Sequence, residues 1–127
     1  MQIVSAQFVE NYEMRQAPGP STRIDLTGVF FSMASPTPVP VTLEPHLVAL
    51  LWCPPDEAGQ GVLEVVFHRD GEQIARNASP FTVEPGKFTY RLVRSELEFA
   101  EYGQIVAHCR IDLGPWHLVP LTLLPPA

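Results

Sequence analysis

Residues 101–123, EYGQIVAHCRIDLGPWHLVPLTL, carry the clearest structural pattern in this chain. They predict two strands joined by a tight turn at residues 112–115, where Asp, Gly and Pro occur together. Successive side chains of a strand alternate between its faces, so a hairpin sorts them into two sets. A register that pairs Cys109 with Val119 merges the apolar set into one surface, which predicts a core hairpin of an all-β protein. That set is Ile105, Ala107, Cys109, Ile111, Val119, Leu121 and Leu123.

The composition indicates a folded chain that does not bind nucleic acid. The 127 residues are 46% hydrophobic and 17% charged, which is unlike a disordered chain. The net charge of −6 disfavours nucleic acid, because its binders cluster Lys and Arg against phosphates. The same acidic balance disfavours anionic membrane surfaces. We expect one domain, residues 1–127, large enough to bury a core.

The N-terminal residues predict the compartment. Residues 1–16 carry neither a basic segment nor a long apolar segment, so we expect no export signal and a cytoplasmic protein. No apolar run approaches the length of a membrane helix. Cys53 and Cys109 are then expected to be reduced thiols, whereas an exported protein could join them in an inter-sheet disulfide.

The remaining pattern predicts more strands. Residues 46–53 are apolar on both faces and should form a central strand. Asp70-Gly71 is typical of a hairpin turn, and Gly28 suggests a bulge or a close backbone approach. Residues 10–22 are expected to be a connection, the prolines of residues 36–45 an extended crossover, and residues 95–100 a single helical turn. The other predicted strands are residues 1–9, 23–33, 61–69, 72–77, 81–83 and 87–93.

These elements predict a two-sheet antiparallel sandwich of about seven to nine strands, with at most one short helical turn. The alternation of apolar residues along the strands predicts which side chains form the core between the sheets. The predicted core is Leu47, Leu51, Leu63, Val65, Phe67, Leu92, Ile105, Ala107, Cys109, Leu121 and Leu123.

Two segments resemble the immunoglobulin-like β-sandwich. LEVVFHRDGEQIA (residues 63–75) is similar to that family's third strand and its following hairpin. RLVRSELEFAEYGQIVAHC (residues 91–109) is similar to the segment that ends in its Asp-x-Gly-x-Tyr-x-Cys signature, with Glu101 for Asp and Gly103 in place. Ile105 and Ala107 replace the family's Tyr and Cys, so the resemblance implies immunoglobulin-like topology without the tyrosine corner or disulfide. The chain also resembles small uncharacterised bacterial β-sandwich proteins.

No residue pattern indicates catalysis, a metal or a cofactor. The four histidines lack the spacing of zinc ligands, and adjacent His108 and Cys109 point to opposite faces. The two cysteines lie in apolar strands, where burial lowers thiol reactivity. Ser95 with Glu98 fits a helix capping box, and no nucleophile elbow or phosphate loop occurs. We therefore expect no enzyme, no catalytic residue and no cofactor.

The second face of the terminal hairpin is the predicted functional surface. Val106, Trp116 and Leu118 lie on it and make it more apolar than a solvated sheet face. An exposed Trp beside a Leu is typical of protein interfaces, although a covering loop would also explain it. The first hypothesis is a non-catalytic interaction or assembly module that binds a protein partner or itself. The alternatives are a small-ligand binding protein, which uses loops or an inter-sheet pocket, and, third, an enzyme.

Overall fold

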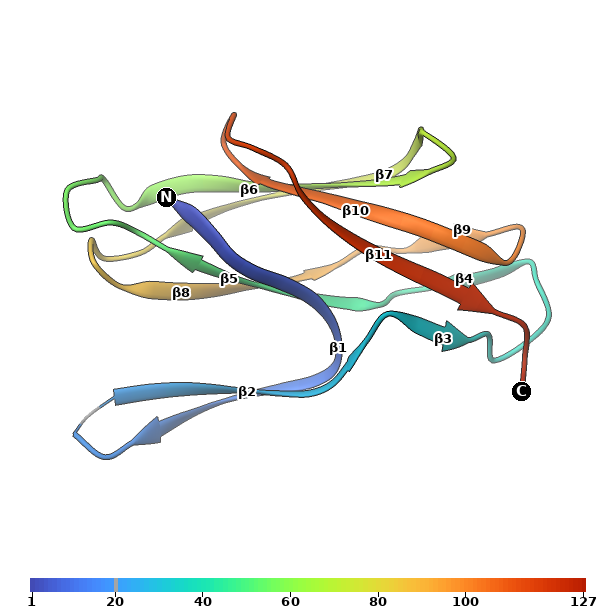
Figure 1. Cartoon of the computed structure of the whole chain (residues 1–127), viewed down its shortest axis with the longest axis horizontal. Helices are drawn as coiled ribbons and strands as arrows, with labels where there is room; N and C mark the ends of the chain where they lie inside the picture. The colour runs from blue at the N-terminus through green and yellow to red at the C-terminus, as the bar shows by residue number, and fades with distance from the viewer. Residues whose placement is uncertain (20) are drawn as a thin grey trace.

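The computed structural model describes residues 1–19 and 21–127, and it is all-β (Figure 1). Eleven strands occur in the described residues, more than the expected seven to nine, because three of them are only three residues long. The described part of the chain contains no helix that could cross a membrane. The strands are β1 (Gln2–Ala17), β2 (Ser21–Phe30), β3 (Ser32–Ala34), β4 (Val41–Leu43), β5 (His46–Trp52), β6 (Gln60–Arg69), β7 (Glu72–Thr82), β8 (Phe88–Arg94), β9 (Leu97–Phe99), β10 (Gly103–Ile111) and β11 (His117–Leu124).

Two large sheets contain most of these strands. Sheet A has the order β2-β1-β5-β8, sheet B has the order β3-β11-β10-β6-β7, and β4 pairs with β9 alone. The predicted central position of residues 46–53 is confirmed, because β5 lies between β1 and β8. All pairings are antiparallel except β3 with β11, which is parallel, so the expected fully antiparallel arrangement is wrong there. The connection between these two strands runs through residues 35–116, which is far longer than the crossover that a parallel pair requires.

One hydrophobic core takes side chains from both sheets. Phe8 and Leu51 enter it from sheet A, and Phe67 and Leu121 enter it from sheet B. Ten of the eleven predicted core residues are buried, and Leu92 is the exception. On β8 its neighbour Val93 is buried instead, so the assignment of faces on this strand was wrong by one residue.

The terminal hairpin β10–β11 has the predicted faces and a different register. All seven apolar side chains assigned to its inner face are buried. Cys109 pairs with His117 rather than with Val119, which is opposite Ala107. The turn is tighter than expected, because Asp112 adopts a φ of 50° and the Gly114 N–H donates to the Ile111 carbonyl at 2.9 Å. A shift of two residues preserves which face each side chain occupies, so burial alone does not distinguish the two registers.

Three other expectations from the sequence are corrected. Residues 10–22 are not a simple connection, because β1 runs to Ala17 and pairs with β2 as a long hairpin. Residues 95–100 form no helical turn and no capping box, since Leu97 and Phe99 alternate into the core from strand β9. The two strands predicted at residues 72–77 and 81–83 are one strand, β7, which ends at Thr82 and tolerates Pro80 because it is an edge strand.

The two glycine predictions are confirmed in the backbone. Asp70 and Gly71, with φ values of 50° and 80°, form the turn between β6 and β7. Gly28 adopts a φ of 65°, and a Cβ placed there would lie 2.5 Å from the Glu10 side chain, so this is a close approach.

Candidate functional site

The outer face of sheet B carries the three residues predicted from the sequence. Val106 of β10 is half-buried and lies opposite Pro120, and Leu118 of β11 lies opposite His108. Trp116 directly precedes β11. Trp116 is 43% exposed and Leu118 is 56% exposed, so no segment of the described chain covers them fully. The structure therefore brings a Trp, a Leu and a Val together on one solvent-facing surface.

The ring of Trp116 is held by two neighbours from β10. The guanidinium of Arg110 lies over the indole, 4.1 Å from the ring centroid. His108 meets the same indole edge-on at a centroid distance of 6.1 Å, and His68 of β6 contacts His108 at 4.3 Å. A cation over one face and an aromatic edge beside it restrict the indole to one orientation. Trp116 is therefore exposed and pre-oriented at the same time.

A carboxylate on β6 fixes the position of Arg110. Glu64 accepts a hydrogen bond from the Nε–H of Arg110 and another from the Nε–H of Arg76 on β7, each at 2.7 Å. Its side chain is only 14% exposed. Hydrogen bonds from Arg76 and Arg110 hold the pKa of the Glu64 carboxyl below its usual value, because both favour the ionised form. A chain of contacts therefore runs across the face from Arg76 through Glu64 and Arg110 to Trp116.

A shallow cavity of about 310 Å³ lies beside this chain of contacts. Its lining residues are Val62, Glu64, Arg76, Arg110, Asp112 and Leu113. The Asp112 carboxylate accepts a hydrogen bond from the Val62 N–H at 3.0 Å, and the Asp112 N–H donates to the Val62 carbonyl at 2.9 Å. Asp112 is thus tied to the end of β6, while Leu113 at the tip of the turn is 87% exposed.

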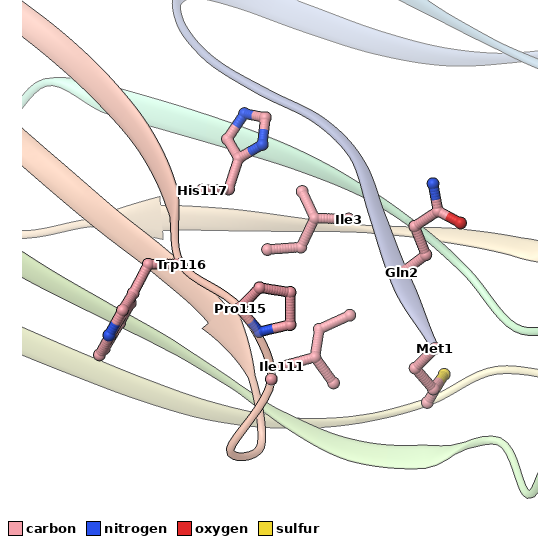
Figure 2. A pocket seen from close by; sticks show the side chains of 8 residues that line it. Met1, Gln2, Ile3, Ile111, Pro115, Trp116 and His117 are labelled. Atoms are coloured by element: carbon pink, nitrogen blue, oxygen red, sulfur yellow. The ribbon is translucent and has the colours of Figure 1, made fainter.

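A second cavity, of about 370 Å³, lies between the start of β1 and the β10–β11 turn (Figure 2). Figure 2 shows Ile3, Ile111, Pro115 and His117 around this space, while the Trp116 side chain points away from it. The walls are of mixed polarity, with aliphatic side chains beside polar groups that include the His117 imidazole. The lining residues are Met1, Gln2, Ile3, Ile111, Gly114, Pro115, Trp116 and His117.

The cysteines and histidines do not form a reactive centre in the described chain. Cys53 and Cys109 are buried and unpaired. Burial raises the pKa of the Cys109 thiol to about 12, which leaves it protonated and unreactive. No set of three or more His, Cys, Asp or Glu side chains converges as metal ligands in residues 1–19 and 21–127.

Sequence reasoning placed Arg110 on this face of the terminal hairpin and missed Glu64 and Arg76 as parts of the same surface. The signal was present, because both occupy outward positions of predicted strands. Their meeting depends on the registers of β6 with β7 and with β10, which place Glu64 opposite Ala78 and opposite Arg110. A second exposed aromatic was also missed: Phe88, 64% exposed, lies 6.4 Å from Trp52 between ring centroids on sheet A.

Comparison with known proteins adds no relative. No protein-family model matches the chain, and no curated protein matches it.

Proposed function

We propose that this protein is a non-catalytic interaction or assembly module that binds a protein partner, or a second copy of itself, through the outer face of sheet B. The observation that carries the proposal is Trp116, which is 43% exposed yet held in one orientation by Arg110 and His108. Leu118 and Val106 extend the apolar surface around it.

The energetics of association favour such an anchor. Trp is among the residues that dominate binding energy at protein interfaces, especially near the centre of the contact. A side chain that is already ordered before binding loses less conformational entropy when the partner arrives. Solvated faces of antiparallel sheets carry mainly polar residues, so an exposed Trp and Leu on one face indicate a covering surface.

The proposal includes an immunoglobulin-like sandwich. In that fold one sheet contains the neighbours A, B and E, and the other contains C, F and G. The order β1-β5-β8 in sheet A and β6-β10-β11 in sheet B agrees with those neighbours when the strands are taken in chain order. We also propose a reducing compartment, the cytoplasm, because Cys53 and Cys109 remain unpaired thiols.

Replacing Trp116 tests the interaction surface. We expect Trp116→Ala to weaken self-association or partner binding by about 2 kcal/mol or more and to leave the fold intact. Sedimentation velocity measures self-association, and quantitative affinity capture from the native cell compares the partners of both variants. Phe88→Ala is the matched control, because Phe88 is an exposed aromatic on the other sheet. Unchanged association and an unchanged set of partners in Trp116→Ala would refute the proposal.

The cavity of Figure 2 supports a second candidate, a small-ligand binding protein. About 370 Å³ lies within the range of small-molecule sites, and walls of mixed polarity that include an imidazole suit a small ligand with both apolar and hydrogen-bonding groups. A metabolite that binds only the folded protein raises its melting temperature. We expect any such increase to disappear in Ile3→Trp, which fills the cavity, and to persist in Trp116→Ala if the ligand lies where Figure 2 shows open space.

A further inference from the structure

Two arginines on the proposed interaction surface have guanidinium N–H groups that make no hydrogen bond within the described residues. Arg76 and Arg110 each donate their Nε–H to a different oxygen of Glu64, at 2.7 Å. No hydrogen bond from the terminal nitrogens of either guanidinium occurs within residues 1–19 and 21–127. Glu64 therefore orients both guanidiniums through one edge and leaves the other edge of each open.

The formal charges of the cavity lining cancel, because Arg76 and Arg110 are matched by the carboxylates of Glu64 and Asp112. Glu64 is shared by the two guanidiniums, and the Asp112 carboxylate accepts a hydrogen bond from the Val62 N–H, so the cavity offers a ligand the open edges of the two guanidiniums. Arg76 is 51% exposed on its side chain, Arg110 is 25% exposed, and both line the cavity of about 310 Å³. Paired N–H groups of a guanidinium match the two oxygens of a carboxylate. The cavity thus offers two oriented guanidinium edges beside an apolar rim of Val62 and Leu113.

We propose that this cavity binds a carboxylate of the protein partner, an Asp or Glu side chain that lies next to an apolar residue seated on Trp116 and Leu118. The inference rests on the proposed function and names the chemistry of the partner. The carboxylate takes the open edges of Arg76 and Arg110, and the apolar residue takes the exposed indole. The partner segment is therefore acidic and apolar, rather than basic.

The acidic character of the whole chain does not oppose this assignment. The net charge is −6, so an acidic partner is repelled at long range. At physiological ionic strength charges are screened beyond about 8 Å, so contacts inside the cavity outweigh the distant carboxylates. The same screening predicts that binding weakens as salt is raised, because the contact itself is ionic.

Selection from a random-peptide display library on the purified full chain provides a defined probe. We expect the selected peptides to be enriched in Asp or Glu beside an aromatic or aliphatic residue. A synthetic peptide of a selected sequence should bind the Arg76→Gln variant about tenfold more weakly than it binds the wild-type protein. Arg76→Lys should give an intermediate affinity, because it keeps the charge and loses the paired donors. Arg23→Gln is the control, since Arg23 is an exposed arginine outside this surface and should leave affinity unchanged.

The outcomes separate the two proposals. Peptides that need Trp116, lack acidic residues and bind Arg76→Gln normally would overturn the carboxylate site and leave the proposed interaction surface standing. Peptides that bind Trp116→Ala as well as the wild type, or a selection that yields no binder, would overturn both. Self-association that is lost in Trp116→Ala but insensitive to salt and to Arg76→Gln would identify a second copy as the occupant and refute the acidic partner.

Discussion

Phe67 is the largest side chain of sheet B that is almost completely buried. It is 1% exposed and lies on β6, the strand between β10 and β7. Phe67→Ala removes that side chain and leaves a cavity, so we expect a loss of about 3–5 kcal/mol in the free energy of unfolding. Urea denaturation measures it. Leu113→Ala is the control and should change stability by less than about 0.5 kcal/mol, because Leu113 is 87% exposed; a similar small effect for Phe67→Ala would contradict the observed packing.

Glu64 makes stability depend on pH. Its pKa is lowered in the folded state by hydrogen bonds from Arg76 and Arg110, so the ionised form stabilises the fold. That contribution is present above the ordinary value of 4.5 and is lost as pH falls through the lowered folded-state pKa. We expect Glu64→Gln to be less stable than the wild type at neutral pH and the difference to shrink as the solution is acidified. A difference that stays constant across this range would show that the ion pairs contribute nothing.

The two thiols should behave as core side chains. Cys53 and Cys109 are both fully buried, and burial raises the pKa of Cys109 to about 12. We expect no reaction of either thiol with a thiol reagent in the native protein at mildly alkaline pH. Both should react after unfolding in denaturant without reductant. A denatured chain that has no free thiol would reveal a disulfide and contradict the observed pairing state.

At the level of elements, the junction at the open end of the β6–β7 pair, where Gly59 precedes β6 and Val83 follows β7, requires a residue without a side chain. A Cβ at Gly59 would lie 1.6 Å from the Val83 carbonyl oxygen, and the Val83 N–H donates to the Gly59 carbonyl at 2.7 Å. Gly59→Ala must displace backbone, so we expect a loss of about 1–3 kcal/mol in stability. Gln60→Ala, at the neighbouring exposed position, is the control for thermal unfolding. Equal melting temperatures for both variants would mean that the junction adjusts without cost.

The strands also show which features of the fold the sequence pattern predicts and which it does not. Alternation assigned the faces of the β10–β11 hairpin, because side-chain parity follows directly from strand geometry. Alternation did not determine the register of the two strands. The positive φ of Asp112 shortens the turn, and each side chain keeps the same face in either register. The pattern did not predict the end of β1, because residues 10–17 are largely polar and exposed. A two-stranded hairpin that projects from a sheet has no core to face, so its residues need not alternate. The pattern mistook residues 95–100 for a helical turn, because Leu97 and Phe99 fit a short strand only once β4 is beside them.

The candidate site was predictable in part for the same reason. Trp116 and Leu118 were found from one hairpin, whose two strands are adjacent in sequence. The contact of Glu64 with Arg76 and Arg110 joins three strands, and no local pattern gives the registers of all three. A sequence reader can therefore find the apolar anchor but not the ionic cluster that orients it.

At the scale of the whole molecule, two edge strands carry features that oppose pairing with another chain. Pro80 removes a donor from the edge strand β7, and Arg91 of the edge strand β8 reaches across to the Pro80 carbonyl. Prolines and inward charges on edge strands oppose such pairing. These features disfavour association through β7 and β8.

Removing the arginine that reaches from β8 to β7 should change how the protein associates. Arg91→Thr removes the side chain that reaches from β8 to the Pro80 carbonyl of β7, so we expect new self-association through that edge. Sedimentation velocity over a range of concentrations measures it. Arg94→Thr, an exposed arginine of the same strand, is the control and should remain like the wild type. Association that is the same in all three proteins would show that Arg91 does not guard the edge.

The long strand β1 has a mechanical consequence. Phe8 and Val9 pair with β2 on one side and with β5 on the other, and both side chains are buried. Residues 10–17 continue beyond β5 with β2 as their paired neighbour, a reach of roughly 25 Å at strand spacing. The β1–β2 hairpin therefore projects from the end of sheet A where β5 begins, and Phe8 and Val9 anchor its base (Figure 1). A force applied near the far end of this hairpin acts as a torque on that end of the sheet.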